Sequence, residues 1–387
     1  SSKNPIIISG GGVFYSDAME ELSKFAIKHN IPVTQTVMGY STMKRDHSHY
    51  AGQIGGLGGK NTNLLAKQTD LAIAVGTKLA DFTTGSWANF ENESFKLVSI
   101  NVSRFDANKH LALAVVGDAK VSLDELSLAL GDWKAGEEWN KKSQVELKAW
   151  NEYVDKESAP SNQEVPSYVQ VIGAIYKNSD PSDIAVTAAG GLVGEVIQVW
   201  RPRELNTHET EWGFSCMSYE ISGALGIKMA NPDKEVISFV GDGSYLLNNT
   251  DIYSSVITNN KLIIIVCDNG GFAVINRLQL FKGGNEYNNL LKSSNTPGLV
   301  DIDFAKHAES MGAKSEHVSS ISDLEEAFKR AKKSKVTYVI SIKTHAYQWL
   351  EGSAFWDSPT LEVPTTKENK EALRLYKEGK SKQRQGV

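Results

Sequence analysis

The sequence is poor in cysteine and has no long apolar run. Only two cysteines, Cys216 and Cys267, occur among 387 residues, and neither has a C-x-x-C neighbour. This excludes a disulfide framework and a cysteine zinc knuckle, and it favours a reducing, cytoplasmic compartment. No apolar run approaches the roughly 18 residues that a membrane-spanning helix needs. The first residues also lack the basic and apolar regions of a signal peptide.

The chain also lacks an excess of charge of one sign. It carries 41 basic and 46 acidic residues, for a formal net charge of −5. This balance argues against a nucleic-acid-binding or membrane-surface protein, so we expect neither kind of partner. The hydrophobic content of 41% is that of a globular protein, and the length suits two or three domains.

What the chain does contain is an alternation of apolar strands and helical patterns in two blocks. The first block predicts strands at residues 5–9, 31–36, 70–76 and 95–102, and helices at 16–29 and 121–130. The second predicts strands at 183–189, 235–240, 262–267 and 337–343, and helices at 167–177 and 217–230. This alternation predicts an α/β protein with two doubly wound parallel-sheet domains.

A charged stretch with three tryptophans separates the two blocks. It has no strand signal and predicts a charged helical linker laid over a surface. We therefore expect a central Rossmann-like domain at 1–131, the linker at 132–165, a second domain at 166–347 and a C-terminal extension at 348–387. From about Thr366 the tail is rich in Lys, Glu and Gln, which predicts a solvated helix.

Two turns in the second block carry the chemistry. Asp242 follows one predicted strand and Asn269 follows another, and the 25 residues between Gly243 and Asn269 have room for a helix and a strand. Carboxylate, amide and carbonyl oxygens suit Mg²⁺ or Ca²⁺ and are poor ligands for zinc. Gly243 and Ser244 open a helix whose N–H groups favour an anion. Either both turns bind one metal-bound diphosphate, or they are merely tight turns; the spacing favours the shared ligand.

The turn signature resembles that of thiamine-diphosphate enzymes, in which GDG is followed by an Asn after an apolar strand. WGFSCMSYEISGALGIKMA (212–230) resembles the preceding segment in the acetolactate-synthase-like branch, and TAAGGL (187–192) resembles the first diphosphate-side loop. The resemblance implies thiamine diphosphate and Mg²⁺ as cofactors, bound to the domain at 166–347.

Carried over position by position, the resemblance implies roles for ten residues. Mg²⁺ would be held by Asp242, Asn269 and the carbonyl of Gly271. The diphosphate would face Gly190, Gly191, Gly243, Ser244 and the amide of Phe272. The bent cofactor would rest on Met217, and its aminopyrimidine would donate to the carbonyl of Ser215. Met217 could instead be an ordinary core residue. Ser218 departs from the family pattern, which has glycine there.

ADFTTGS (80–86), FDANKH (105–110) and FWDSP (355–359) resemble a branch of this family that opens a cyclic diketone in myo-inositol catabolism. This implies a homodimeric or homotetrameric hydrolase that cleaves a C–C bond of a small cyclic diketone and gives 5-deoxy-glucuronate. The family has three domains, of which we expect this chain to hold the middle and the last. Its activating glutamate lies in the first, so we expect no catalytic residue here and an inactive chain by itself.

Two alternatives stay open at this point. One is an acetolactate-synthase-like carboligase or decarboxylase, and the other is a non-catalytic nucleotide-binding α/β protein. SGGGVFYS (9–16) lacks the full G-x-G-x-x-G pattern, so we interpret the central domain as structural. GGLGGKNTN (55–63) is either a flexible loop near the site or a simple turn.

The remaining reactive side chains have ordinary interpretations. The eight histidines form no H-x-x-x-H pair, which favours surface or hydrogen-bonded histidines over metal ligands. For Cys216 we expect a buried, small apolar role rather than a nucleophile. The resemblance implies that Trp356 and Asp357 act as a lid over the site.

Overall fold

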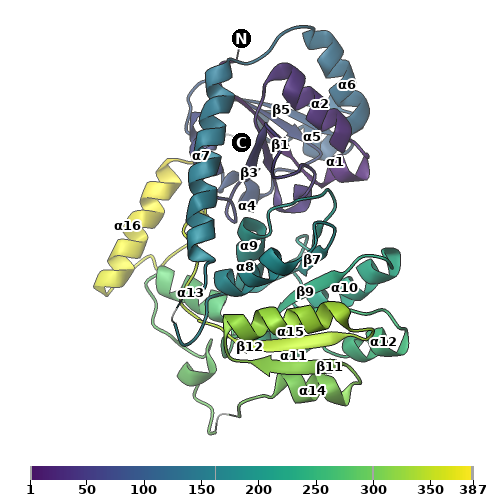
Figure 1. Ribbon diagram of the computed structural model, residues 1–387. Coiled ribbons are helices and arrows are strands. Elements are labelled where there is room, and N and C mark those ends of the chain that lie inside the picture. Colours follow the sequence, from purple (N-terminus) through teal and green to yellow (C-terminus); the bar gives the residue numbers. More distant parts are fainter. Residues whose placement is uncertain (1, 162, 299, 385–387) are drawn as a thin grey trace.

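The computed structural model describes residues 2–161, 163–298 and 300–384. Figure 1 shows two α/β domains, one above the other, with the long helix α7 (Glu137–Glu157) running along the side of both. The predicted α/β class, with two parallel-sheet domains and a charged helical linker, is confirmed. Within the described ranges, no helix combines the length and the apolar character needed to cross a membrane.

The first domain is built on six parallel strands in the order β3-β2-β1-β4-β5-β6. The strands are β1 (Pro5–Ser9), β2 (Val33–Gln35), β3 (Tyr50–Gln53), β4 (Leu71–Val75), β5 (Lys96–Asn101) and β6 (Leu113–Val116). The helices are α1 (Gly11–Tyr15), α2 (Met19–His29), α3 (Lys60–Gln68), α4 (Asp81–Thr84), α5 (Arg104–Ala107) and α6 (Ala119–Leu130). The four predicted strands are present, and β3 and β6 are additions. The helix expected from residue 16 begins at Met19, because α1 ends at Tyr15 and residues 16–18 form a turn in which Asp17 has a left-handed φ of +49°.

The second domain also has six parallel strands, in the order β11-β12-β10-β9-β7-β8. The strands are β7 (Ile184–Thr187), β8 (His208–Thr210), β9 (Val236–Gly241), β10 (Ile263–Asp268), β11 (Lys314–Val318) and β12 (Tyr338–Lys343). The helices are α8 (Tyr168–Asn178), α9 (Gly190–Val199), α10 (Tyr219–Ala230), α11 (Asp242–Leu247), α12 (Asp251–Ile257), α13 (Ala273–Phe281), α14 (Phe304–Ser310) and α15 (Ile321–Lys333). The four predicted strands are confirmed, and β8 and β11 are additions.

The strand order places a switch point at β7. The chain leaves β7 to form β8 on one side and then returns to form β9 on the other side. Ligands of open parallel sheets bind beyond the carboxyl ends of the strands at such a point. The turns after β7, β9 and β10 therefore lie where the topology favours a binding site.

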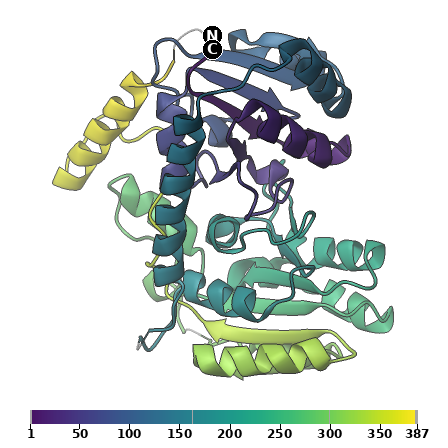
Figure 2. The same ribbon diagram turned by 45° about the horizontal axis from the view of Figure 1, so that its top comes forward.

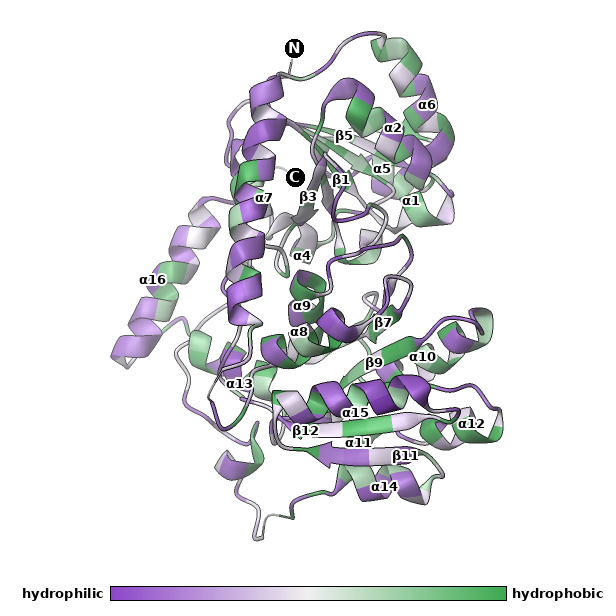
Figure 3. Cartoon of the chain, viewed as in Figure 1, coloured by the Kyte–Doolittle hydropathy of each residue, from purple (hydrophilic) through white to green (hydrophobic). Residues whose placement is uncertain are grey.

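Amphipathic helices cover the sheets. In α15 the buried residues recur with the helical period, namely Leu324, Ala327, Phe328 and Ala331. The face of α15 that is turned outward in Figure 3 is hydrophilic. Ser320 begins this helix by accepting a hydrogen bond from the backbone N–H of Asp323, which satisfies one of the free N–H groups of the first turn. Burial of the apolar stripe attaches the helix to the sheet.

Helix α7 and the C-terminal extension contact both domains, and Figure 2 shows α7 beside both from a second direction. Trp139 Nε1 donates to the carbonyl of Pro5 in β1 (2.7 Å), and Trp150 Nε1 donates to Gln198 Oε1 in α9 (3.0 Å). The expected helix over a surface is confirmed. The tail forms α16 (Lys367–Ser381), which is mostly exposed but buries Asn369 and Ala372.

Candidate functional site

Three turns meet at the carboxyl edge of the second sheet. β9 and β10 are paired in register, with Gly241 beside Cys267, so Asp242 and Asn269 leave neighbouring strands at the same level. The third turn follows β7 and enters α9 at Gly190, where the backbone has a φ of +77°. Because that region of conformation favours glycine, the turn explains the residue at this position.

These turns surround one cavity of about 240 Å³. All ten residues that the sequence singles out line it: Gly190, Gly191, Ser215, Met217, Asp242, Gly243, Ser244, Asn269, Gly271 and Phe272. Other lining residues come from the same turns and from the starts of α8 and α13, among them Tyr168, Ala189, Leu192, Gly241 and Ala273. The predicted set is therefore a spatial cluster as well as a sequence pattern.

Asp242 presents a carboxylate oxygen that no group among the described residues satisfies. The residue is 5% exposed, and its Oδ1 atom is buried without a hydrogen-bond partner. Burial raises the pKa of Asp242 to about 7, and repulsion from the neighbouring Asp268 carboxylate is the second cause of this rise. An unpartnered buried carboxylate oxygen is costly unless it is paired or binds a cation. Asp242 is thus suited to holding a metal ion.

Asn269 repeats this pattern with an amide oxygen. Its Nδ2 donates to the hydroxyl of Tyr168, while its Oδ1 is buried and has no partner in the part of the chain that the structure describes. Asp268, by contrast, is already paired: its Oδ2 lies 2.7 Å from Lys343 Nζ, and its Oδ1 accepts from the backbone N–H of Gly270. The unsatisfied oxygens therefore belong to the two side chains that the sequence predicts as metal ligands.

The donor set consists of oxygen atoms only. Within the part of the chain that the structure describes, no group of three or more His, Cys, Asp and Glu side chains is placed to hold a metal ion. One carboxylate, one amide oxygen and one carbonyl suit Mg²⁺, which takes one or two carboxylates and completes its shell with phosphate and water. These residues fit the implied metal.

Glycine leaves the cavity wall open at two further positions, and at Gly271 the backbone conformation also requires it. Gly271 has a φ of +140°, and a Cβ there would lie 2.5 Å from the carbonyl oxygen of Asn289. A Cβ on Gly243 would lie 2.6 Å from the ring of Phe272. The backbone therefore carries no side chain at the positions where a diphosphate would approach it.

One predicted contact stays a prediction. The amide of Phe272, expected to face a diphosphate, donates in this structure to the carbonyl of Asn289 (2.7 Å). This bond forms because the segment at Asn289 returns alongside the turn, where Gly271 bridges to Leu290. Phe272 still lines the cavity.

The loop before α10 corrects one expectation, the burial of Cys216. Cys216 is exposed rather than buried, because the Glu211 carboxylate holds this loop at the surface by accepting from the backbone N–H groups of Phe214 and Cys216. Ser218, which replaces the family's glycine, has a left-handed φ of +75°. A non-glycine residue pays a steric cost in that conformation, which explains why glycine is usual there.

The sequence pattern does not predict several residues that lie around the cavity. A Cβ on Gly191 would overlap the ring of Trp349, so this tryptophan forms a wall behind the turn after β7. Tyr168 holds Asn269, and the buried Glu220 accepts from the backbone N–H of Ala189 (3.4 Å). All three come from elements distant in sequence from the groups they touch, and no local motif signals them.

The extension after β12 leads away from the cavity. The ring of Trp356 lies 5.2 Å from that of Phe82, and the backbone N–H of Asp357 donates to Ser86 Oγ in the central domain (2.8 Å). Neither Trp356 nor Asp357 is among the residues lining the cavity. Their role as a lid stays a prediction.

The two glycine-rich segments of the first domain pack closely. A Cβ on Gly10 or Gly12 would lie 2.5 Å from backbone atoms of Gly76, so these glycines permit a close approach of two turns. In the segment at 55–63, the carbonyl of Leu57 accepts from Gln198 Nε2 in α9. This segment is therefore packed against the second domain rather than free.

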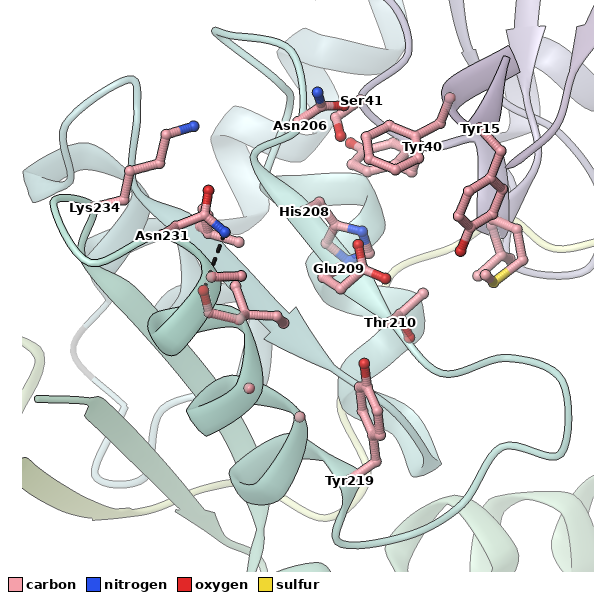
Figure 4. A pocket seen from close by; sticks show the side chains of 18 residues that line it. Tyr15, Tyr40, Ser41, Asn206, His208, Glu209, Thr210, Tyr219, Asn231 and Lys234 are labelled. Carbon is pink, nitrogen blue, oxygen red and sulfur yellow. Dashed lines mark hydrogen bonds between the residues drawn. The ribbon is translucent and has the colours of Figure 1, made fainter. Parts of the chain in front are cut away.

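A second, larger cavity of about 490 Å³ lies between the domains, beside β8 and α10 (Figure 4). Tyr15 and Tyr40 face it from the first domain, and His208 and Tyr219 face it from the second. None of the ten predicted residues lines it. Burial lowers the pKa of His208 to about 3, so this imidazole stays neutral.

Three histidines of the first domain make ordinary hydrogen bonds. His29 Nδ1 lies 2.6 Å from the carbonyl of Trp133, His47 Nε2 lies 2.9 Å from Ser23 Oγ, and His49 Nε2 lies 3.1 Å from Asn30 Oδ1. The predicted hydrogen-bonded role is confirmed for these three.

Comparison with protein families agrees with this architecture. Residues 1–126 match the central domain of thiamine pyrophosphate enzymes, and residues 188–342 match the C-terminal TPP binding domain of the same enzymes. Thiamine pyrophosphate is another name for thiamine diphosphate. The chain belongs to the thiamine pyrophosphate enzyme family.

The chain is also similar to individual proteins of known name. The chain is 37% identical to a protein of Clostridium tetani over 387 residues (92% of this chain, 60% of the relative). It is 36% identical to a Geobacillus thermodenitrificans protein over 411 residues (98% and 63%) and 36% identical to a Clostridium botulinum protein over 409 residues (97% and 63%). All three are named 3D-(3,5/4)-trihydroxycyclohexane-1,2-dione hydrolase. The chain spans about three fifths of the length of these relatives.

Proposed function

We propose that this chain provides the magnesium- and diphosphate-binding part of a thiamine diphosphate site in a hydrolase. The proposed reaction opens the ring of a trihydroxycyclohexane-1,2-dione to give 5-deoxy-glucuronate, in myo-inositol catabolism. The observation that carries the cofactor assignment is the pair of buried oxygens without partners, Asp242 Oδ1 and Asn269 Oδ1, at one cavity. The relatives' shared name supports the ring-opening reaction over a carboligase or a non-catalytic protein.

In this proposal each turn has a distinct task. Asp242, Asn269 and the carbonyl of Gly271 hold Mg²⁺, whose charge attracts the diphosphate. The bare backbone of the turns after β7 and β9, at Gly190, Gly191, Gly243 and Ser244, lets the diphosphate oxygens approach. The diphosphate is thereby fixed at the carboxyl edge of the sheet.

The loop before α10 orients the other end of the cofactor. Met217 is half-buried at the cavity and supports the bent cofactor, while the carbonyl of Ser215 accepts from the aminopyrimidine. When bound, thiamine diphosphate supplies the carbon nucleophile that C–C cleavage beside a carbonyl requires. The residues of this chain bind and orient it.

We also propose a homodimer or homotetramer with a small-molecule substrate. The homo-oligomer rests on the resemblance to the family. The two unpaired cysteines, Cys216 and Cys267, support the predicted cytoplasmic location.

A calorimetric titration of this chain with thiamine diphosphate in Mg²⁺ tests the cofactor assignment. We expect binding by the unaltered chain and loss of binding in Asp242→Ala, because the metal loses its carboxylate. Asp251→Ala is the matched control, since Asp251 also begins a helix of this domain but does not line the cavity. Equal binding by the unaltered chain and Asp242→Ala would refute the assignment.

The ring-opening reaction is tested in a chimera that carries the first domain of the Clostridium tetani relative ahead of residue 1. We expect the cyclic diketone to yield 5-deoxy-glucuronate and pyruvate to yield no acetolactate. Acetolactate formation without ring opening would favour the carboligase instead.

A further inference from the structure

The turn after β10 carries two of the three proposed metal ligands but has little conformational restraint of its own. Asn269 offers its side-chain oxygen and Gly271 its backbone carbonyl, with Gly270 between them. Both glycines have a positive φ, +76° at Gly270 and +140° at Gly271. Because glycine has the widest choice of backbone conformations, two successive glycines do not by themselves hold two oxygens at fixed positions. Neighbouring groups must therefore fix this turn.

The far end of the turn is fixed by the segment that returns alongside it. The carbonyl of Gly270 accepts from the backbone N–H of Leu291 (2.8 Å), and the carbonyl of Asn289 accepts from that of Phe272 (2.7 Å). These bonds restrain the chain after Asn269. The near end, where the chain leaves β10, needs a separate restraint.

Asp268 supplies that restraint. It is the last residue of β10, and its Oδ1 accepts a hydrogen bond from the backbone N–H of Gly270 (3.0 Å). A carboxylate only accepts and a backbone N–H only donates, so this bond has a single direction. An Asp side chain that bonds to the backbone two residues further on closes an Asx turn around the residue between them. That residue is Asn269.

Lys343 holds the second oxygen of Asp268. β10 and β12 are paired with Asp268 beside Lys343, and Lys343 Nζ lies 2.7 Å from Asp268 Oδ2 and 2.5 Å from Asp301 Oδ1. Asp268 is only 7% exposed, and its backbone carbonyl accepts from the N–H of Thr344 (2.7 Å). A buried carboxylate is tolerated where it is paired in this way. Each oxygen of Asp268 thus has its own donor, which restrains the orientation of the side chain.

Asp268 lies beside the site rather than in it. It is not among the residues that line the cavity, whereas Asp242, Asn269 and Gly271 are. Any effect of Asp268 on ligand geometry therefore passes through the turn that follows it.

We propose that Asp268 is a positioning residue that shapes this turn, so that Asn269 and Gly271 present their oxygens to the metal. Lys343 assists by fixing the second oxygen of Asp268. This role rests on the proposed function, because it gives the turn a metal to bind. Groups that orient metal ligands through hydrogen bonds typically change metal affinity by about 10- to 100-fold when they are removed.

The experiment measures the Mg²⁺ concentration that supports half-maximal thiamine diphosphate binding, by calorimetry on two double variants of this chain. Asp268→Asn/Lys343→Met and Asp268→Ala/Lys343→Met both remove the ion pair, but only the first keeps an oxygen that can accept from the Gly270 N–H. Because the lysine is absent from both, no ammonium competes for that oxygen.

The first double variant should differ from the unaltered chain by less than about threefold, and the second should need about tenfold more Mg²⁺ than the first. Equal Mg²⁺ requirements in the two double variants would overturn the proposal.

A second buried ion pair of the same domain gives the matched control, Asp183→Ala/Lys332→Met. Asp183 is 2% exposed, its Oδ2 lies 2.7 Å from Lys332 Nζ, and it accepts from the backbone N–H of Asp180 (2.9 Å). It precedes β7, at the opposite edge of the sheet, and does not line the cavity. We expect lower stability and an unchanged Mg²⁺ requirement. A similar tenfold rise in this control would show that general destabilisation explains the effect, and it would overturn the proposal.

A second measurement needs neither metal nor cofactor. Amide hydrogen exchange at Gly270 should be about tenfold faster in Asp268→Ala/Lys343→Met than in Asp268→Asn/Lys343→Met, because only the alanine variant loses the acceptor. Equal exchange rates would show that Asp268 does not hold the turn and would overturn the proposal.

Failure of the proposed function has a different signature. If neither the unaltered chain nor the chimera with the relative's first domain binds thiamine diphosphate at any Mg²⁺ concentration, the cofactor site itself is refuted. The role of Asp268 toward a metal is then refuted with it, even where exchange at Gly270 still differs between the two double variants.

Discussion

At the scale of single residues, the second domain buries carboxylates that have few charge partners. Asp242 keeps an unpartnered oxygen at the cavity, and Glu195 accepts a backbone hydrogen bond from Leu350 inside the core. Burial raises the pKa of Glu195 to about 7, against smaller opposite effects of the Leu350 amide and of Arg277. A carboxylate in such a place destabilises the fold once it is charged.

We therefore predict that Glu195 makes the free energy of unfolding depend on pH. Its folded pKa exceeds the unfolded value, so the folded state binds more protons and stability falls as the pH rises from about 4.5 to about 7. Glu195→Gln keeps an acceptor for the Leu350 amide but cannot ionise. We expect its stability relative to the unaltered chain to rise over this window by on the order of 3 kcal/mol, at about 1.4 kcal/mol per pKa unit.

Urea unfolding at pH 4.5 and pH 8, with both proteins free of metal and cofactor, measures this difference. Glu326→Gln, at an exposed position of α15, controls for the loss of a carboxylate; the hydrogen bond from Lys329 lowers the pKa of Glu326, so any trend of this variant with pH should have the opposite sign. A constant difference between Glu195→Gln and the unaltered chain at both pH values would contradict the prediction.

At the scale of elements, one carboxylate of the C-terminal extension links α16 to the segment that precedes it. Asp357 accepts hydrogen bonds from Tyr376 Oη (2.7 Å), Lys380 Nζ (2.9 Å) and Gln383 Nε2 (3.1 Å). Its own backbone N–H is bound to Ser86 of the central domain. This carboxylate is the main polar contact between the helix and the preceding segment.

Asp357→Ala should therefore loosen α16 without affecting the cavity. We expect amide hydrogen exchange in α16 to become at least about tenfold faster, since each lost bond to a charged group contributes about 1.5–3 kcal/mol. Thiamine diphosphate binding should not change. Glu371→Ala is the control, because Glu371 pairs with Arg374 on the same helix. Unchanged exchange in Asp357→Ala would contradict this and show that other contacts, such as that of Asn369 with Gly283, hold the helix.

The sequence predicts the elements that have a strong apolar signal. β9 and β10 are continuous buried runs, whereas β8 consists of His208–Thr210 and β11 of Lys314–Val318, which are too polar to be recognised. Their backbones form strands because the sheet offers them an edge partner. Tertiary context decides these elements, so local pattern cannot find them.

The residues of the candidate site likewise divide into those that local sequence predicts and those that only the folded structure brings together. The ten predicted residues lie in turns directly after strands or in one loop before a helix, so topology alone brings them together. Tyr168 and Asn269, by contrast, are 101 positions apart and meet only because α8 packs against the edge of the sheet. Trp349 and Glu195 act at a similar distance. Such supporting contacts require the folded structure.

At the scale of the whole molecule, α7 joins the two domains through a tryptophan. Trp150 is 8% exposed, belongs to the core of the second domain and donates to Gln198. A Cβ on Gly59 of the central domain would lie 2.8 Å from its indole nitrogen. One side chain thus packs against both domains.

Trp150→Ala should weaken the coupling between the domains. Truncation of a buried tryptophan typically costs about 3–5 kcal/mol, and we expect calorimetric unfolding to separate into two transitions. Val145→Ala, at an exposed position on the same helix, should change stability by less than about 0.5 kcal/mol. A single transition with a loss below about 1 kcal/mol would indicate that Trp150 does not join the domains.

The central claim concerns where the metal binds, and anomalous diffraction from crystals of this chain grown with Mn²⁺ and thiamine diphosphate tests it most directly. We predict one anomalous peak at the carboxyl edge of the second sheet, with Asp242 Oδ1, Asn269 Oδ1 and the carbonyl of Gly271 as protein ligands. A metal bound by other residues, or a bound diphosphate without a metal at these three oxygens, would contradict the assignment.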